Sequence, residues 1–367
     1  IGGILIPWWF AQHKQAVVVV IGPCFDDQTE ILTDGGWKPF PMLTRTEKVA
    51  SLEKGRLKFV TPSDWINEPY TGPMMGYKSL AVDFLVTPNH KQWTRFKEIG
   101  AFRLVPTSEI FDKSDWIIQA KVKWRGKATR HSEDTYEMWG FWFADGYSQA
   151  ERDKAGHQRY RVMLTQKKYR DYARWLFSWA YPDMVIHESK RPGGTSDFIV
   201  NNKALATWFE QEFKREGVKR IPRWLKQASN SQIRAFLHGY MMGDGSFKHG
   251  SEGQDRIRVC DNPGLADDLH EVAVLAGYRV TLRQRTYKGT HLDASLSFLR
   301  RPQVRLQRDG WYEVAYSGRI YCVTVPSGVV LVRRNGVVHW SGNTHRQVHD
   351  VVWRELKAAI NGSRIPI

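Results

Sequence analysis

The sequence predicts a multidomain protein in which an all-β domain is split by an inserted α+β domain, with a short α/β segment at each end. Residues 29–120 and 311–340 consist of short alternating runs of polar and apolar residues, broken by glycine, proline and aspartate. Residues 133–308 between them mix helical and strand patterns. A chain of 367 residues also exceeds the usual size of one hydrophobic core. The two β regions are therefore expected to form one domain around the insertion.

A hairpin is expected near the end of the second β region. Asn335-Gly336 separates two apolar runs, and this dipeptide is a strong signal for a two-residue β-hairpin.

The two ends of the chain read as one unit when the middle is removed. Residues 1–23 finish on an apolar strand, and residues 344–367 begin with Thr344-His-Arg-Gln and continue with apolar residues at helical spacing. Joined, they predict a strand, a tight turn and an amphipathic helix. Residues 24–343 therefore interrupt another protein.

The positive charge is concentrated in the inserted region. The whole chain has a net charge of +16. Residues 24–120 carry 12 Lys and Arg against 13 Asp and Glu, a balance of −1, whereas residues 121–310 carry 34 against 22, a balance of +12. A basic excess confined to one segment indicates that this segment binds a polyanion.

Composition also argues against some classes of protein. No apolar run is long enough to span a bilayer, and the apolar start of the chain lacks the basic region of a signal peptide, so no membrane association is expected. Cys24, Cys260 and Cys322 are too few for a disulfide framework, which favours a reducing cytoplasm. The chain is expected to act as a monomer.

Reactive residues stand at both edges of the interrupting block. Cys24 can attack the carbonyl carbon of Pro23 to form a thioester, and Asn343 can cyclise onto its own backbone carbonyl and release Thr344. The Thr344 hydroxyl can take over the acyl group between these steps. Inside the block, Thr87 and His90 end an apolar strand, where they could hold and protonate the amide that is cut.

This ordered set of motifs resembles the intein family. The matching blocks are Cys24-Phe-Asp-Asp-Gln-Thr29, Thr87-x-x-His90, Ile320-Tyr-Cys-Val-Thr-Val-Pro326 and Ser341-Gly342-Asn343. The resemblance covers 343 − 24 + 1 = 320 residues. It implies the all-β HINT splicing fold and cofactor-free self-splicing that joins Pro23 to Thr344.

Two positions depart from the family pattern. Most inteins have histidine before the terminal asparagine, where this chain has Gly342, and the histidine of the preceding block is absent near Val330. Cyclisation of Asn343 therefore needs other help, from His339 or from an ordered water.

Cys322 is a second candidate nucleophile. Trp93 together with Cys322 resembles an intein subclass that attacks first with this internal cysteine, and that subclass usually has threonine where this chain has Ser341. A buried small apolar side chain is the alternative interpretation of Cys322. We expect Cys24 to attack first, with Cys322 assisting or relaying the acyl group.

Two segments of the inserted region repeat one pattern. Residues 138–146 and 237–245 each place small residues four apart and end in Asp-Gly, at Asp145 and Asp244. Small residues at this spacing let two helix backbones approach closely, which would bring both aspartates together. Facing carboxylates bind Mg²⁺ and can set up a water for attack on a phosphodiester. Two ordinary helices with Asp-Gly ends are the alternative.

Both repeats resemble the LAGLIDADG homing endonucleases, whose single-chain members are pseudo-dimers. The resemblance implies Mg²⁺-dependent cleavage of double-stranded DNA at a homing site, with β-ribbons in the major groove. Residues 159–168 and 279–288 are expected to be corresponding strands of the two halves. DNA contacts are assigned to Lys167, Lys168, Arg283, Arg285 and Lys288.

The joined flanks resemble the ATPase domain of phage terminase large subunits over 23 + 24 = 47 residues, and no P-loop motif is present. Two other interpretations stay open: a DNA endonuclease on a splicing-inactive HINT scaffold, and a terminase motor fragment with a structural insertion. The expected domains are an N-terminal flank (1–23), a HINT domain (24–130 and 311–343), an endonuclease (131–310) and a C-terminal flank (344–367).

Overall fold

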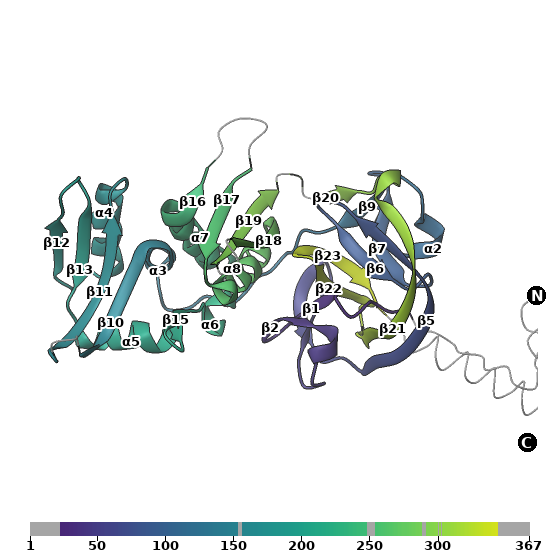
Figure 1. Ribbon diagram of the computed structural model, residues 1–367, viewed down its shortest axis with the longest axis horizontal. Coiled ribbons are helices and arrows are strands. Elements are labelled where there is room, and N and C mark those ends of the chain that lie inside the picture. Colours follow the sequence, from purple (N-terminus) through teal and green to yellow (C-terminus); the bar gives the residue numbers. More distant parts are fainter. Residues whose placement is uncertain are drawn as a thin grey trace, which may run out of the picture.

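The computed structural model describes residues 23–152, 156–247, 254–287, 291–299, 301 and 303–343. Within these residues a β lobe and an inserted α+β lobe lie side by side (Figure 1). The two expected flanks, the terminase-like match and Thr344 lie outside the described residues, except Pro23.

Strands from both sides of the insertion build the β lobe. Before the insertion they are β1 (Glu30–Thr33), β2 (Gly36–Pro39), β3 (Val49–Glu53), β4 (Arg56–Val60), β5 (Asp64–Lys78), β6 (Asp83–Val86), β7 (Lys91–Phe96), β8 (Arg103–Pro106) and β9 (Trp116–Gln119), with the short helix α2 (Thr107–Ile110). After the insertion they are β20 (Gln303–Arg305), β21 (Trp311–Thr324), β22 (Val329–Arg334) and β23 (Val337–Gly342).

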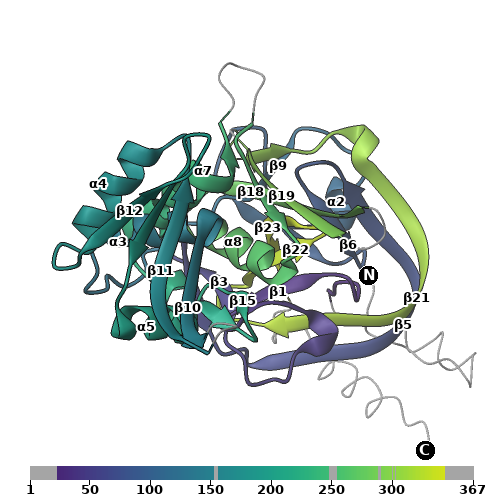
Figure 2. The same ribbon diagram turned by 60° about the vertical axis from the view of Figure 1, so that its left-hand side comes forward.

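The two sets of strands pair with each other. β21 pairs with β5 from Trp311 opposite Tyr77 to Thr324 opposite Asp64. β22 pairs with β1, and β23 pairs with β7. The β5–β21 ribbon curves around one side of the lobe (Figure 2). The two β regions of the sequence thus form one domain, as their alternating pattern predicts.

One boundary differs from the expected division. β20 pairs with β9 and belongs to the β lobe. The insertion therefore ends between Leu299 and Gln303, ahead of residue 310. The short alternating pattern of residues 303–305 gave no signal to separate them from the inserted strands.

The predicted hairpin at Asn335-Gly336 is confirmed. It joins β22 to β23, and both turn residues have positive φ, 49° at Asn335 and 72° at Gly336. A type I′ turn requires this left-handed conformation at both positions.

The inserted lobe repeats one order of elements twice. The first half is α3 (Glu133–Asp145), β10 (Gly146–Arg152), β11 (Gln158–Gln166), α4 (Arg170–Ala180), β12 (Ile186–Lys190), β13 (Ser196–Val200) and α5 (Lys203–Phe213). The second is α7 (Asn230–Asp244), β16 (Gly245–Ser246), β17 (Arg256–Cys260), α8 (Pro263–Leu275), β18 (Arg279–Tyr287) and β19 (His291–Leu299). The elements between the halves are β14 (Lys214–Arg215), β15 (Val218–Lys219) and α6 (Arg223–Lys226).

The sheets of the two halves have the same strand order. It is β10-β11-β13-β12 in the first and β16-β17-β19-β18 in the second. The counterpart of β11 is therefore β17, and that of β18 is β12. The expected correspondence between residues 159–168 and 279–288 is wrong, because a shared basic composition does not identify a strand's place in a duplicated sheet.

Helices α3 and α7 pack with their backbones in contact. A Cβ on Gly140 would overlap the carbonyl oxygen of Phe236, and a Cβ on Gly239 would overlap that of Glu137. This confirms the close approach predicted from the small residues. Ser132 and Ser229 cap the two helix starts through their side chains.

The glycines that follow the two helices, Gly146 and Gly245, are not left-handed caps of the kind that often ends a helix. Gly146 and Gly245 are extended, with φ of −93° and −94°, and not left-handed. A Cβ there would overlap the last helical turn, at Trp142 and Met241 respectively. Glycine is needed for space, so that each chain can turn directly from helix to strand.

Candidate functional site

Cys24 is buried in the β lobe, directly beside Cys322. The next residue, Phe25, exchanges two backbone hydrogen bonds with Tyr321, at 2.8 and 3.0 Å, in an antiparallel bridge. Residues adjacent to such a pair face each other at close range. The two thiols accordingly hydrogen-bond, and this contact, with burial, raises the pKa of Cys24 well above its usual value. Cys24 is therefore protonated at neutral pH until a base acts on it.

Thr87 holds the peptide unit at Cys24. Its Oγ1 accepts a hydrogen bond from the Cys24 backbone N at 3.0 Å, and its own backbone N donates to the Cys24 carbonyl oxygen at 3.0 Å. The Cys24 nitrogen belongs to the Pro23–Cys24 bond. The structure therefore places the Thr87 hydroxyl on the amide expected to be cut.

His90 lies between the two junctions. Its Nε2 is 2.9 Å from Ser341 Oγ, and its ring packs on Phe25 with centroids 4.4 Å apart. Burial lowers the pKa of His90 to about 3, while a hydrogen bond to the Pro23 backbone opposes that shift. The imidazole is therefore neutral at pH 7.

His90 and Ser341 belong to one hydrogen-bond chain with Gln92. Ser341 Oγ is 2.9 Å from His90 Nε2 and 3.2 Å from Gln92 Oε1. The Pro23 backbone has a carbonyl acceptor and no N–H, so His90 donates the hydrogen bond to Pro23. A neutral imidazole in such a chain can transfer a proton between its partners.

The C-terminal junction presents polar groups on one face of β23. His339 and Ser341 alternate on this strand, and Asn343 follows in the same phase. Both ring nitrogens of His339 and both amide atoms of Asn343 are buried and have no hydrogen-bond partner among the described residues. Burial also lowers the pKa of His339 to about 3. Unpaired buried polar groups are uncommon in folded proteins, and here they gather where reaction chemistry is expected.

The neighbouring strand explains why residue 342 is glycine. A Cβ there would overlap the backbone carbonyl oxygen of Lys91 on the neighbouring strand β7 and lie 2.9 Å from Leu104 Cδ2. The position that is histidine in most inteins therefore has no space for a side chain in this protein.

Trp93 is not part of the junction cluster. It lies on the opposite face of β7 from Gln92, and its Nε1 donates to Gln119 Oε1 at 2.9 Å. Gln92 contacts Ser341 instead, and the sequence reasoning missed it. The available signal was strand alternation, since Gln92 is two residues from His90 and therefore shares its face.

Asp145 and Asp244 form the second candidate site, at the adjoining C-terminal ends of α3 and α7. Burial and the charge of Asp244 raise the pKa of Asp145, and burial raises that of Asp244. Helix C-termini add further negative potential. Two carboxylates in a negative setting suit Mg²⁺, which binds through one or two carboxylates and keeps several waters. No cluster of three or more His, Cys, Asp or Glu ligands occurs in the described part of the chain.

Lys219 and Gln166 complete this acidic site. The Nζ of Lys219 donates to the carbonyl oxygens of Trp142 and Phe143 at 3.0 Å each, at the end of α3. Burial lowers the pKa of Lys219 to about 8, against the opposing charges of Asp244 and Asp145. Gln166 Nε2 donates to Asp145 Oδ2. Lys219 lies in a two-residue strand between the halves and has no motif that could have revealed it.

The predicted DNA-binding residues fall on two surfaces. Arg283 and Arg285 are exposed on one face of the second sheet. Arg258 lies on the same face, because it and Arg283 both pair with Ser295 of β19. Arg256, two residues before Arg258, shares this face. Lys167 and Lys168 are exposed beyond the end of β11. Lys288 lies outside the described residues.

No family model matches the chain. It is 24% identical over 298 residues to an ATP-dependent Clp protease proteolytic subunit of Chlamydomonas moewusii, covering 71% of this chain and 28% of that protein. It is 22% identical to a DNA-directed RNA polymerase subunit beta C-terminal section of Stigeoclonium helveticum, covering 88% of this chain and 36% of that protein. It is 21% identical to a ribonucleoside-diphosphate reductase subunit beta of Aquifex aeolicus, covering 88% and 50%. The chain thus spans half or less of these relatives.

Solved structures similar to the chain include homing endonucleases and an intein. The structure of I-DmoI in complex with DNA and Ca is 17% identical, covers 46% of this chain and 83% of that one, and has a TM-score of 0.36. The AceL NrdHF class 3 split intein is 7% identical, covers 88% of this chain and 99% of that one, and has a TM-score of 0.32. Among the described residues, no helix is long and apolar enough to cross a membrane.

Proposed function

We propose that residues 24–343 excise themselves and join Pro23 to Thr344, and that the inserted lobe cleaves double-stranded DNA. The observation that carries the splicing proposal is the convergence of the two junctions on His90. This side chain hydrogen-bonds the Pro23 backbone and also Ser341, which is 251 positions away in sequence and two residues before Asn343. A β domain with only a structural role would not need to bring the Pro23–Cys24 peptide bond and the strand that leads to Asn343 to the same buried histidine.

The first step is attack of the Cys24 sulfur on the Pro23 carbonyl carbon. The thiol loses its proton and the Cys24 nitrogen gains one as the peptide becomes a thioester. His90 is placed to move this proton, since it is neutral and lies beside the same peptide. Thr87 Oγ1 orients the nitrogen that leaves.

The later steps use the C-terminal junction. The Thr344 hydroxyl attacks the thioester, which frees the Cys24 thiol and gives an ester. The Asn343 side-chain nitrogen then attacks its own backbone carbonyl carbon, closing a ring and releasing the α-amine of Thr344. That amine attacks the ester to form the Pro23–Thr344 peptide bond. We assign His339 as the group that assists cyclisation, because it shares a strand face with Asn343.

Cys322 assists the first step from its position against Cys24. Cys24→Ala is expected to abolish excision, and Cys322→Ala to slow it, as followed by mass spectrometry of the purified chain. Cys260→Ala is the matched control, because Cys260 is exposed on β17 in the inserted lobe. Splicing by Cys24→Ala together with no splicing by Cys322→Ala would reverse the order of attack.

The inserted lobe has the features of a DNA-cleaving hydrolase. Asp145 and Asp244 would hold Mg²⁺, which supplies Lewis-acid activation of a phosphate and of water when bound. Lys219 balances the charge of the pair, and Gln166 orients Asp145. The arginines of the second sheet would hold the phosphate backbone and base edges, since the major groove admits a two-stranded β-ribbon.

The relatives support an interrupting segment. A protease subunit, a polymerase subunit and a reductase subunit have unrelated activities, yet each matches most of this chain. A segment common to all three cannot perform any one of their activities. An insertion that removes itself from its host accounts for this distribution. A terminase host stays a proposal based on the 47 flanking residues.

A further inference from the structure

We infer that the inserted lobe is a working part of the splicing site, and that Arg333 is the positioning residue through which it holds the C-terminal junction. This inference rests on the proposed splicing function. It goes beyond it by assigning the endonuclease lobe a role in the chemistry of the β lobe.

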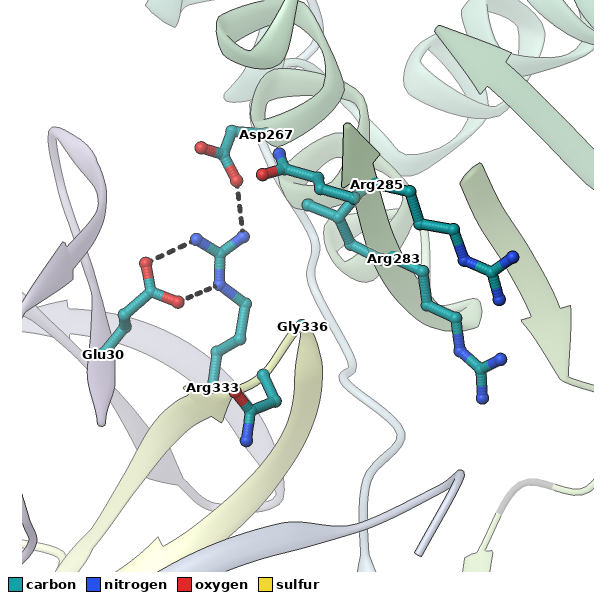
Figure 3. A pocket seen from close by; sticks show the side chains of 9 residues that line it. Glu30, Asp267, Arg283, Arg285, Arg333 and Gly336 are labelled. Carbon is teal, nitrogen blue, oxygen red and sulfur yellow. Dashed lines mark hydrogen bonds and ion pairs between the residues drawn. The ribbon is translucent and has the colours of Figure 1, made fainter. Parts of the chain in front are cut away.

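Arg333 links the two lobes through a buried guanidinium. Its Nη2 and Nε bind the two carboxylate oxygens of Glu30 on β1, at 2.5 and 2.6 Å. Its Nη1 binds Asp267 Oδ1 on α8 at 2.8 Å. Figure 3 shows Arg333 between these two carboxylates, one from each lobe. Bidentate pairing fixes the guanidinium plane as well as its position.

Aromatic side chains surround this bridge. The Arg333 guanidinium lies over the Trp37 ring, 4.9 Å from its centroid, and Nη1 is 3.3 Å from His270 Nδ1 on α8. His270 is buried, and burial, with the charge of Arg333, lowers its pKa well below the usual value. His270 therefore stays neutral and can accept from Arg333. Every donating nitrogen of the guanidinium thus has a partner: Nε and Nη2 in the β lobe, and Nη1 in the inserted lobe.

The hairpin that carries the C-terminal junction is attached to the inserted lobe at its tip as well. The Leu282 backbone N on β18 donates to the Gly336 carbonyl oxygen at 3.0 Å, and Thr281 pairs with Val337. A Cβ on Gly336 would overlap the Leu282 carbonyl oxygen. Strand β23 therefore pairs with β18 at the edge of the inserted lobe's second sheet.

The face of β23 opposite the junction residues lies in an apolar cluster that includes side chains of both lobes. Trp340, between His339 and Ser341, is fully buried in the same apolar cluster as Leu269 and Val272 of α8. Arg333 is next to Val332, the backbone partner of His339. Movement of α8 relative to β22 would therefore change the positions of His339 and Asn343.

The neighbouring Arg334 provides an internal comparison. It binds Asp26 at 2.9 Å and Asp83 at 2.6 Å, close to Cys24 and Thr87, and all of these residues belong to the β lobe. The N-terminal junction is thus held within its own lobe. Loss of the Arg333–Asp267 contact should affect the C-terminal step and leave the N-terminal step intact.

The test uses Asp267→Asn and Arg333→Met in the full chain. Two rates are measured by mass spectrometry: thiol-induced cleavage at Pro23–Cys24 in an Asn343→Ala background, and cleavage at Asn343–Thr344 in a Cys24→Ala background. We expect C-terminal cleavage to fall about tenfold in Arg333→Met and about threefold in Asp267→Asn, as for loss of a charge-assisted hydrogen bond that positions a reacting group. N-terminal cleavage should stay within about twofold, the scale of a surface change.

Asp261→Asn is the matched control. Asp261 pairs with His291 in the same lobe, and its side chain is 55% exposed, compared with 44% for Asp267. In the double variant, Asp267→Asn should have no further effect once Arg333 is replaced. Equal loss of both rates, or no loss in Asp267→Asn, would overturn the inference. Asp267→Asn retains the Glu30–Arg333 pair and serves if Arg333→Met does not fold. Absence of both cleavages in their backgrounds with Arg333 and Asp267 intact would instead contradict the proposed splicing function.

Discussion

Replacing Gly342 with histidine, the residue most of the intein family has there, is expected to block C-terminal cleavage instead of improving it. The new Cβ would overlap the Lys91 carbonyl oxygen, so β23 would have to move away from β7. That movement separates Ser341 from its partners His90 and Gln92. A displacement of about 1 Å can reduce a catalysed rate about 100-fold, and we expect a loss of at least this size.

The measurement is the rate of release at Asn343–Thr344, followed by mass spectrometry. Gly342→Ala should lose most of the same activity, because Cβ is already the clashing atom. Gly35→His is the control, since a Cβ at Gly35 meets only Thr33 Oγ1, at 3.5 Å. Release by Gly342→His at the unsubstituted rate would show that β23 does not hold the junction as described.

Replacement of either member of the acidic pair, Asp145→Asn or Asp244→Asn, is expected to remove DNA cleavage without lowering stability. Mutation of a residue that hydrogen-bonds a metal ligand typically lowers metal affinity or activity about 10–100-fold. Loss of a direct carboxylate ligand should therefore lower the cleavage rate more than about 100-fold. The folded state raises the pKa of both groups, so their charged forms oppose folding. This destabilisation is absent at a pH below the pKa of these aspartates in the unfolded chain, and it grows as the pH rises through their pKa in the folded protein. At neutral pH, asparagine should therefore leave Tm unchanged or raise it.

Nicking of a supercoiled plasmid carrying the DNA that encodes the joined flanks, with Mg²⁺, measures the activity. Thermal unfolding without Mg²⁺ measures the stability. Asp171→Asn is the control, because Asp171 is on the surface of α4, with a side chain 97% exposed. Undiminished nicking by both pair variants would contradict the metal assignment.

The parts of the fold that follow from local pattern were predictable from the sequence. The Asn335-Gly336 turn needs only two residues that tolerate positive φ. The α3–α7 contact follows from small residues at helical spacing, which leave no side chain between the backbones. The alternating runs predicted strands, and the split of the β lobe followed from their recurrence after residue 310.

Features that depend on tertiary convergence were not predictable. The role proposed for Lys219 depends on its contacts with the end of α3, and a short strand with one lysine does not indicate them. Arg333 and Arg334 resemble ordinary strand-end residues in sequence, yet they bind carboxylates on other elements. Gln92, and not the expected Trp93, contacts Ser341, because a single step along β7 reverses the face of the sheet.

The most direct test is the mass of the freshly expressed chain. We expect the 42.6 kDa chain to be replaced by a 320-residue product, residues 24–343, and by a 23 + 24 = 47-residue product that joins Pro23 to Thr344. The excised product should be one water lighter than residues 24–343 with a free C-terminal carboxylate, as expected for a cyclised Asn343, and Asn343→Ala should prevent formation of the joined product. An intact chain that accumulates with a well-folded β lobe, and with no thioester trapped by added thiol, would contradict the account.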